Sequence, residues 1–538
     1  MTRAAVPLLL VAIVLIRLWP TLDYDFLWDD SWVIVENTEL GDVRRIPGYF
    51  VNSVAHAYGK SEHAADLNLY RPLYSTQLTL VAWLGGTSAR AFRAVLLAWH
   101  LLAGLLLFRL VRRRTNDGIA FLAALAVLLH PVTMEAYLWP TEVIDPMATT
   151  FLLCAWSLFT SERDERGVLT GLAVLAIALT KEVYLVGAAP ILLWLVWRRG
   201  IPVWRLLPSA GAALLAFGLR LNALDGTAAG DPDRLLLAAT RAPLLILDGL
   251  RGIALQRPFG LRHLGLEYES LGSWVLAGAA LLLAALVVGA WRMRHRWPDG
   301  LLALGVAIVM LGPVAIPTSY PTWGGYGRYV YMPAIGVAWA VALGLARVPE
   351  RLRLGAGVAV AAWFGVQMLS VPSARAVWQN DATLNRSAAR AAPNAPTSAL
   401  RLSNEAMNSG DYATAAALYE ELLAATWGSH VTREAQNLAV AYLELGEPTK
   451  ALAVLDRLEA FKGPGPMSVF ARGRARLMTG DLAGAASAAV FGLERAPGHP
   501  DLVWLARSVA AQDGGPAALR DAAAGRPIAE ELGGLLTP

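Results

Sequence analysis

Residues 92–110 read FRAVLLAWHLLAGLLLFRL, and this stretch decides the fold class. A helix needs about 20 mostly apolar residues to cross a hydrocarbon core about 30 Å thick. Ten more apolar runs predict spans at 5–20, 118–134, 146–160, 167–181, 184–198, 204–221, 274–291, 300–316, 329–346 and 354–371. The sequence therefore predicts an all-α, polytopic membrane bundle of 11 spans.

The composition favours the same class. Of 538 residues, 56% are hydrophobic and 16% are charged, whereas soluble globular chains are about 45–50% apolar and about 25% charged. These values exclude one large soluble enzyme and a disordered protein. The single cysteine, Cys154, excludes an internal disulfide and a Cys-based zinc site. The net charge of +4 does not indicate nucleic-acid binding, because the arginines cluster beside apolar runs.

Arginine placement predicts the orientation. Cytoplasmic loops carry an excess of Lys and Arg, and a cytoplasmic N-terminus puts every short basic cluster on one side if 237–256 is re-entrant or interfacial. These clusters are Arg109 with Arg112, Arg113 and Arg114; Arg163 with Arg166; Arg198, Arg199 and Arg205; Arg292, Arg294 and Arg296; and Arg347, Arg351 and Arg353. We therefore expect a multi-pass protein of the inner (plasma) membrane with an extracytoplasmic (periplasmic) C-terminal tail.

The tail after residue 371 has a repeating pattern. Gly410, Gly446 and Gly480 are 36 and 34 residues apart, and small residues recur at matching positions between them. This pattern resembles the tetratricopeptide repeat (TPR), a helix–turn–helix unit; generic Ala-rich helices are the alternative. We predict a transmembrane domain at 1–371, a linker at 372–396 and an α-solenoid of TPRs at 397–538, which suits the binding of a peptide.

Asp29 and Asp30 follow the first predicted span, within DFLWDDSWVIVEN. A carboxylate can take a proton from a hydroxyl nucleophile or ligate a divalent cation such as Mg or Mn. The alternative is a solvated, helix-capping pair. The flanking aromatic residues favour a site at the depth of the membrane interface.

Three cations lie on the same predicted face: Arg71, Lys181 and Arg328. Each is a candidate for binding phosphate, and for Arg71 and Lys181 the alternative is snorkelling to the interface. Glu182 is adjacent to Lys181, and because neighbouring positions do not share a helix face, the two should have separate partners. A Gly- and aromatic-rich loop at 318–327 precedes Arg328, and such a loop can stack on a sugar or close over a lipid headgroup.

Polar residues also interrupt the apolar pattern in HPVTMEAYLWPTEVID, residues 130–145. His130, Glu135 and Asp145 are expected to face a cavity, because polar groups at membrane depth rarely face lipid. An interfacial turn with satisfied polar groups is the alternative.

Motifs for ATP, dinucleotide, zinc-hydrolase and serine-hydrolase chemistry are absent from the sequence.

The ordered set of one N-terminal span, an Asp pair, YRP, HPxxxEAxxW, KE, RYxYxP and terminal repeats resembles the transmembrane and TPR-containing O-mannosyltransferases. These belong to the GT-C superfamily of membrane glycosyltransferases, and the resemblance runs from about residue 17 to about residue 510. It implies a polyprenyl-phosphate sugar donor and an acceptor hydroxyl on an extracytoplasmic protein or peptide.

The resemblance also implies roles for the candidates. Asp29 or Asp30 becomes the catalytic base, and Arg71, Lys181 and Arg328 become partners of the donor phosphate. The donor-phosphate and sugar pocket is completed by His130, Glu135, Asp145 and Glu182. One departure is Val143, where relatives usually have Arg two positions before the Asp; Trp378 and Asp381 match the Trp and acidic pair expected after the last span.

Other functions remain open at this point. The acceptor alternatives are a glycolipid and an envelope polysaccharide. A third hypothesis is a membrane-anchored TPR scaffold without catalytic activity, although one transmembrane helix would suffice as an anchor and the sequence predicts 11. A secondary transporter is a fourth, although its charged residues would be expected near the bilayer midplane.

Overall fold

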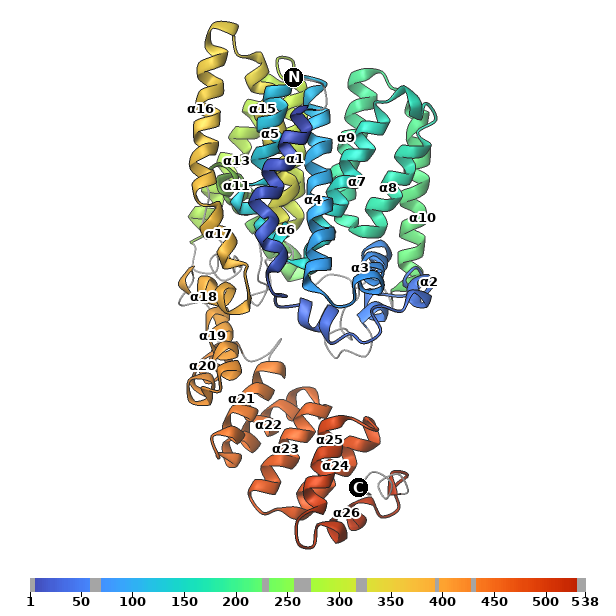
Figure 1. The fold of residues 1–538 in the computed structure, drawn as a ribbon, viewed down its shortest axis with the longest axis vertical. Helices are drawn as coiled ribbons and strands as arrows, with labels where there is room; N and C mark the ends of the chain where they lie inside the picture. Colours follow the sequence, from blue (N-terminus) through green and yellow to red (C-terminus); the bar gives the residue numbers. More distant parts are fainter. Residues whose placement is uncertain are drawn as a thin grey trace. The chain divides into compact units, whose positions relative to one another are not determined.

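The computed structural model describes residues 5–58, 69–224, 232–255, 272–315, 327–391, 396–426 and 432–529. Regular structure within these ranges is helical, with no strand among them, as the sequence predicts. The chain forms two compact units, Met1–Ser387 and Ala388–Pro538. Figure 1 shows the helices of both units.

The first unit is a bundle of helices joined by short turns. Its helices are α1 (Ala5–Leu18), α2 (Ile46–Tyr49), α3 (Pro72–Gly85), α4 (Ala89–Arg112), α5 (Asp117–Leu128), α6 (Met134–Leu138), α7 (Ile144–Phe159), α8 (Val168–Thr180), α9 (Leu185–Arg199), α10 (Leu207–Ala223), α11 (Pro232–Leu255), α13 (Ser273–Met293), α14 (Pro298–Leu311), α15 (Tyr331–Arg347), α16 (Glu350–Leu369), α17 (Val371–Val377) and α18 (Asp381–Ala391). The α18 helix begins in this unit and continues past its boundary.

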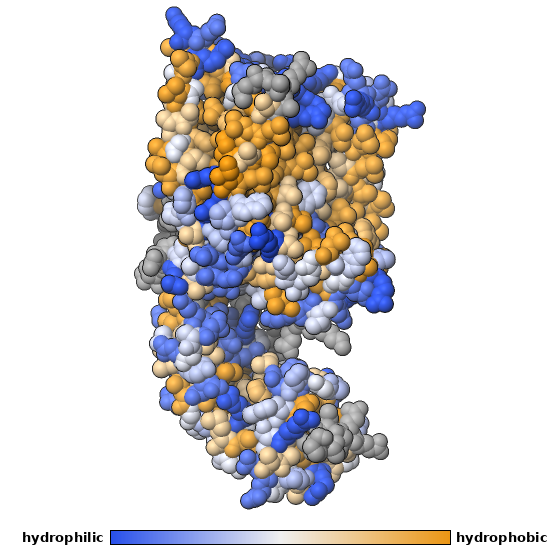
Figure 2. Space-filling model, in the orientation of Figure 1, coloured by the Kyte–Doolittle hydropathy of each residue, from blue (hydrophilic) through white to orange (hydrophobic). Residues whose placement is uncertain are grey.

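Seven described helices are long and apolar enough to cross a membrane, or eight if the pair Asp117–Leu128 and Pro131–Leu138, bent by 47°, is one span. The α8 and α14 helices are apolar but shorter. Each predicted span coincides with a helix, but the total of 11 spans stays a prediction. The α11 helix, which contains most of 237–256, is not among the candidate spans. Figure 2 shows hydrophobic surface over this bundle, with hydrophilic residues toward its ends. The protein is therefore a multi-pass membrane protein.

Small residues allow the central helices to approach closely. The α14 helix packs along α15, and α4 packs against both α5 and α7. A Cβ on Gly336 would lie 2.6 Å from the carbonyl oxygen of Ala303, so only glycine permits this contact between α15 and α14. Small residues at such contacts are typical of membrane helices.

Prolines place several helix ends at one end of the bundle. Pro72 begins α3, Pro131 follows α5, and Pro140 stands just before α7. Proline is tolerated in the first turn of a helix but ends a preceding one, because it lacks an N–H and restricts the residue before it. Within 130–145, His130 therefore lies in the turn after α5, Glu135 in the short α6, and Asp145 in the first turn of α7. Most of the predicted 318–327 loop lies outside the described residues.

The second unit consists of α19 (Pro396–Ser409), α20 (Tyr412–Thr426), α21 (Thr432–Glu444), α22 (Pro448–Lys462), α23 (Pro466–Met478), α24 (Leu482–Arg495), α25 (Pro500–Ala510) and α26 (Gly515–Ala523). Successive helices pack in pairs, α19 with α20, α21 with α22 and α23 with α24. Gly410, Gly446 and Gly480 connect the paired helices with φ of 78°, 75° and 80°, a region that favours glycine. The TPR interpretation stays a prediction.

Candidate active site

A cavity of about 460 Å³ opens among the helix ends of the first unit. It is bounded by the turn after α1, the start of α3, the turn before α7, the turn between α8 and α9, and the segment before α15. Six of the predicted site residues line it: Asp29, Arg71, Asp145, Lys181, Glu182 and Arg328. Residues separated by up to 299 positions in sequence thus share one charged cavity.

The two adjacent aspartates have different surroundings. Asp29 is partly buried and lines the cavity, and its Oδ1 accepts a hydrogen bond of 3.4 Å from Trp32 Nε1. Trp28, directly before it, has a φ of 42°, which is unusual for a bulky residue and is maintained only by surrounding contacts. The ring of Trp28 stacks on that of Trp139, with the ring centroids 5.4 Å apart. The backbone N–H of Trp28 donates to Asp381 Oδ1 at 2.8 Å. These contacts fix the backbone that presents Asp29.

Asp30 is fully buried and connects two loops. Its Oδ2 accepts from Leu27 N at 2.8 Å, and its Oδ1 accepts from Thr141 N at 2.9 Å. The loop after α1 is thereby connected to the turn that carries Glu142 and leads into α7, where Asp145 lies. Asp30 is absent from the cavity lining, so we infer that Asp29 is the candidate base and Asp30 is a positioning residue.

Burial raises the pKa of Asp30 to about 7, although hydrogen bonds from Leu27 and the nearby charge of Arg93 oppose this shift. The folded protein therefore keeps a proton that the unfolded chain releases above about pH 4. The stabilisation that this retained proton gives the folded state is complete below about pH 4 and is lost as the pH rises through about 7.

We expect the melting temperature of the wild type to fall more steeply between about pH 4 and about pH 7 than that of Asp30→Asn, which cannot titrate. The variant also loses one acceptor, so the comparison concerns the slopes rather than the absolute values. Melting curves of both detergent-solubilised proteins measure this difference. Parallel slopes would show that Asp30 does not titrate in this range.

Arg71 differs from the other two cations of the lining. Within the part of the chain that the structure describes, Arg71 forms no ion pair, and its Nε is buried without a hydrogen-bond partner. It precedes Pro72, the first residue of α3, so its backbone position is restrained. A guanidinium presents several donors in a planar fork that matches phosphate oxygens. Arg71 is therefore available to an anionic ligand in the cavity.

Lys181 and Asp145 form a buried ion pair at 2.7 Å. The hydroxyl of Tyr184 also donates to Asp145 Oδ1, at 2.9 Å. Glu182 instead pairs with Arg220 on α10 at 3.1 Å. The adjacent Lys181 and Glu182 thus have separate partners, as their sequence spacing predicts. The positive charge of Lys181 is compensated by the carboxylate of Asp145.

Arg328 lies between two carboxylates. It forms ion pairs with Glu142 and, at 3.5 Å, with Glu135, and its guanidinium lies 5.4 Å from the centroid of Trp139. Glu135 also accepts a hydrogen bond from Gly327 N at 2.8 Å, and it is outside the cavity lining. Arg328 therefore connects the 135–142 segment to the start of α15.

The atypical position Val143 is buried in an apolar cluster, so this chain has no cation there. Its neighbour Glu142 lines the cavity instead and pairs with Arg328. A carboxylate paired with Arg328 therefore lies beside the position where the resemblance implies an arginine.

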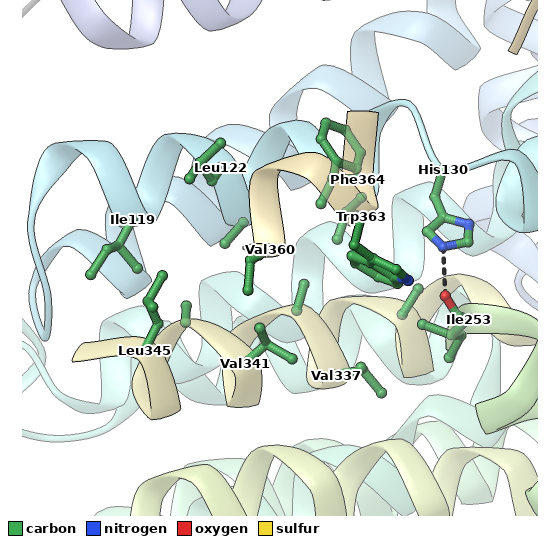
Figure 3. Close-up of a pocket in the computed structure, with 16 residues that line it drawn as sticks. Ile119, Leu122, His130, Ile253, Val337, Val341, Leu345, Val360, Trp363 and Phe364 are labelled. Atoms are coloured by element: carbon green, nitrogen blue, oxygen red, sulfur yellow. Dashed lines mark hydrogen bonds between the residues drawn. The ribbon is translucent and has the colours of Figure 1, made fainter. Parts of the chain in front are cut away.

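His130 lies outside the charged cavity. Its Nδ1 accepts from Val132 N at 3.1 Å, and its Nε2 is 2.9 Å from the carbonyl oxygen of Ile253. It lies at one end of an apolar pocket between α5, α15 and α16, as Figure 3 shows. The structure therefore gives His130 a role in joining the 130–133 turn to α11.

A divalent cation does not fit the aspartate pair. Both oxygens of Asp30 are directed at backbone N–H groups, so the two carboxylates do not face one ion. Among the described residues, no group of three His, Cys, Asp or Glu side chains is placed to hold a metal. No step of the chemistry below is assigned to a metal.

Sequence reasoning missed several residues of the site. Glu142 and Tyr184 contact the predicted residues, and both line the cavity. Arg93, inside the apolar α4, is buried and donates to the carbonyl oxygens of Tyr24, Asp25 and Leu138. An arginine within an apolar span is costly without partners, and that signal could have identified Arg93 as a residue that holds these loops.

The fold and the site describe a membrane helix bundle with a charged cavity at one end. Residues 71–222 match the sequence model of the dolichyl-phosphate-mannose-protein mannosyltransferases. The chain is also 28% identical over 148 residues to the human protein O-mannosyl-transferase TMTC1. The aligned segment makes up 27% of this chain but only 17% of that protein. No solved structure matches significantly. The predicted resemblance is confirmed over residues 71–222: in this region the membrane protein is similar to O-mannosyltransferases.

Proposed function

We propose that this protein transfers a sugar from a lipid-phosphate-linked donor to a hydroxyl group of an extracytoplasmic protein. The observation that carries the proposal is the shared cavity of Asp29 and Arg71, which offers a carboxylate and a cation without a carboxylate partner among the described residues. The matched region 71–222 contains Arg71, Asp145 and Lys181, and the name of the matching family supports a mannosyl phospholipid as donor.

The proposed reaction is a single displacement. Asp29 accepts the proton of the acceptor hydroxyl, and the hydroxyl oxygen bonds to the anomeric carbon of the sugar. The bond between that carbon and the phosphate oxygen breaks, and the lipid phosphate leaves with its negative charge held by Arg71. The donor already carries its leaving group, so the protein supplies a base, orientation and charge stabilisation.

The C-terminal unit is proposed to hold the acceptor. Paired helices that stack along a chain form extended surfaces suited to peptides. An extracytoplasmic location of this unit follows from the arginine distribution and is part of the proposal. A glycolipid or polysaccharide acceptor would leave the chemistry unchanged.

The direct test is transfer by the purified protein in liposomes, with polyprenyl-phosphate [³H]mannose as donor. Labelled protein or peptide should accumulate if the acceptor is a polypeptide, and labelled lipid or polysaccharide if it is not. Acceptor proteins for the assay come from comparing extracytoplasmic glycoproteins of wild-type and deletion strains. Absence of transfer to every acceptor class, with intact and monodisperse protein, would contradict the proposal.

Arg71→Gln should raise the KM for the donor by about 10-fold to 100-fold, because a charge-assisted bond to phosphate contributes about 1.5–3 kcal/mol. The matched control is Arg90→Gln, since Arg90 forms an exposed ion pair with Asp23 at 2.9 Å. Donor titrations of both variants measure the effect. An unchanged KM in Arg71→Gln would remove Arg71 from the donor site.

A further inference from the structure

A second polar cavity, of about 350 Å³, lies at the opposite ends of the same helices. The α7 helix begins with Ile144 at the Asp29 cavity and reaches the second cavity at Trp156 and Thr160. With 16 residues, α7 is about 24 Å long. The α9 helix likewise starts beside the first cavity and ends at Arg199, which lines the second.

Three arginines converge on this second cavity. Arg113 and Arg114 follow the end of α4, and Arg199 ends α9. None of the three forms an ion pair with a residue that the structure describes, whereas their neighbour Arg112 pairs with Asp117 at 3.4 Å. One carboxylate, Asp299, lines the same cavity without an ion pair to them. The lining thus has an excess of two positive charges, since three arginines face one aspartate.

We propose that the cavity between Arg113, Arg114 and Arg199 binds a phosphate-ester anion, such as the headgroup phosphate of an anionic membrane lipid. Guanidinium groups bind phosphate through paired hydrogen bonds, and basic pockets between membrane helices suit anionic headgroups. The stacked pair Trp156 and Trp339, 3.9 Å apart, forms an aromatic wall of the cavity.

The electrostatics favour an anionic ligand over a purely topological role. The pKa of Arg113 is lowered, first by partial burial and then by the charges of Arg109 and Arg114. A bound anion would relieve this repulsion. Arginines that only orient the helices need no common cavity. Arg113, Arg114 and Arg199 are exposed, as are Arg292, Arg296 and Arg351, but only the first three line the cavity.

The test is binding to the purified full-length protein in neutral detergent, measured by melting temperature and by native mass spectrometry. The probes are phosphatidylglycerol, phosphatidylcholine and inorganic phosphate. Phosphatidylglycerol should stabilise the wild type, and the triple variant Arg113→Gln/Arg114→Gln/Arg199→Gln should weaken its binding at least 10-fold. The matched variant Arg292→Gln/Arg296→Gln/Arg351→Gln should bind like the wild type.

The variant Asp299→Asn keeps the test decisive even if the triple variant misfolds. Removal of this opposing negative charge should tighten the binding of phosphatidylglycerol. Equal effects of inorganic phosphate would identify a free anion as the ligand, whereas a response to phosphatidylglycerol alone would identify a lipid. The proposal is overturned if the triple variant keeps wild-type affinity, if both triple variants lose it equally, or if Asp299→Asn leaves it unchanged. The site is independent of the proposed sugar transfer.

Discussion

Asp29→Asn is expected to lower sugar transfer by about 100-fold to 10,000-fold, the usual contribution of a general base. Asp29 lines the charged cavity, whereas both oxygens of Asp30 accept backbone hydrogen bonds. Asparagine keeps the size of Asp29 but cannot accept a proton from the acceptor hydroxyl. Initial rates of mannosyl transfer in liposomes measure the loss, and the melting temperature should stay close to that of the wild type.

The matched control is Asp30→Asn. It should lower stability by about 1–3 kcal/mol, because one buried N–H loses its acceptor, while the folded fraction keeps most of its transfer activity per molecule. The opposite pattern, with an active Asp29→Asn and a folded but inactive Asp30→Asn, would move the base to Asp30.

Lys181→Met is expected to destabilise the first unit by about 3–5 kcal/mol, because it leaves the buried carboxylate of Asp145 without its cation. The hydroxyl of Tyr184 would remain as a hydrogen-bond donor to Asp145, but it carries no charge. Denaturant or thermal unfolding in detergent measures the change.

The double variant Lys181→Met/Asp145→Leu is the control for this pair. Removal of both charges eliminates the unpaired buried carboxylate, so stability should return toward the wild-type value. If Lys181→Met alone changes the unfolding free energy by less than about 1 kcal/mol, the ion pair contributes little to the stability of the fold.

The longer helices of the bundle were predictable where the sequence has a long apolar run, such as 92–110, whereas short helices such as α2 and α6 were not predicted. The ends of the predicted spans agree with the observed helices to within a few residues in most cases, as for 146–160 and α7, but α3 at Pro72–Gly85 was not predicted. Whether a short helix such as α14 spans the membrane is a question of its tilt and neighbours, which an apolar run does not specify.

The membership of the site was predictable only in part. Arg71, Lys181 and Asp145 are charged residues at helix ends, and charge at that depth signals a cavity. The different roles of Asp29 and Asp30 depend on which carboxylate meets Leu27 N and Thr141 N, and Thr141 is 111 positions away in sequence. That choice is made by tertiary packing, so the sequence pattern does not contain it.

The same limit applies to the candidates that line no part of the cavity. His130 is a polar residue in an apolar context, but its partner is the carbonyl oxygen of Ile253, 123 positions away. The limit also applies to Glu142, which lines the cavity but was not predicted, because its ion pair with Arg328 spans 186 positions. Local pattern identifies such residues as unusual without showing what they contact.

The central claim is that the cavity of Asp29 and Arg71 holds the phosphate and sugar of the donor. An experimental structure of the protein with a non-hydrolysable polyprenyl phosphonate analogue of the mannosyl donor tests it most directly. We predict the phosphonate oxygens within hydrogen-bond distance of the Arg71 guanidinium, and the anomeric carbon on the side of Asp29. A headgroup bound elsewhere in the bundle, with Arg71 and Asp29 both distant from it, would contradict the account.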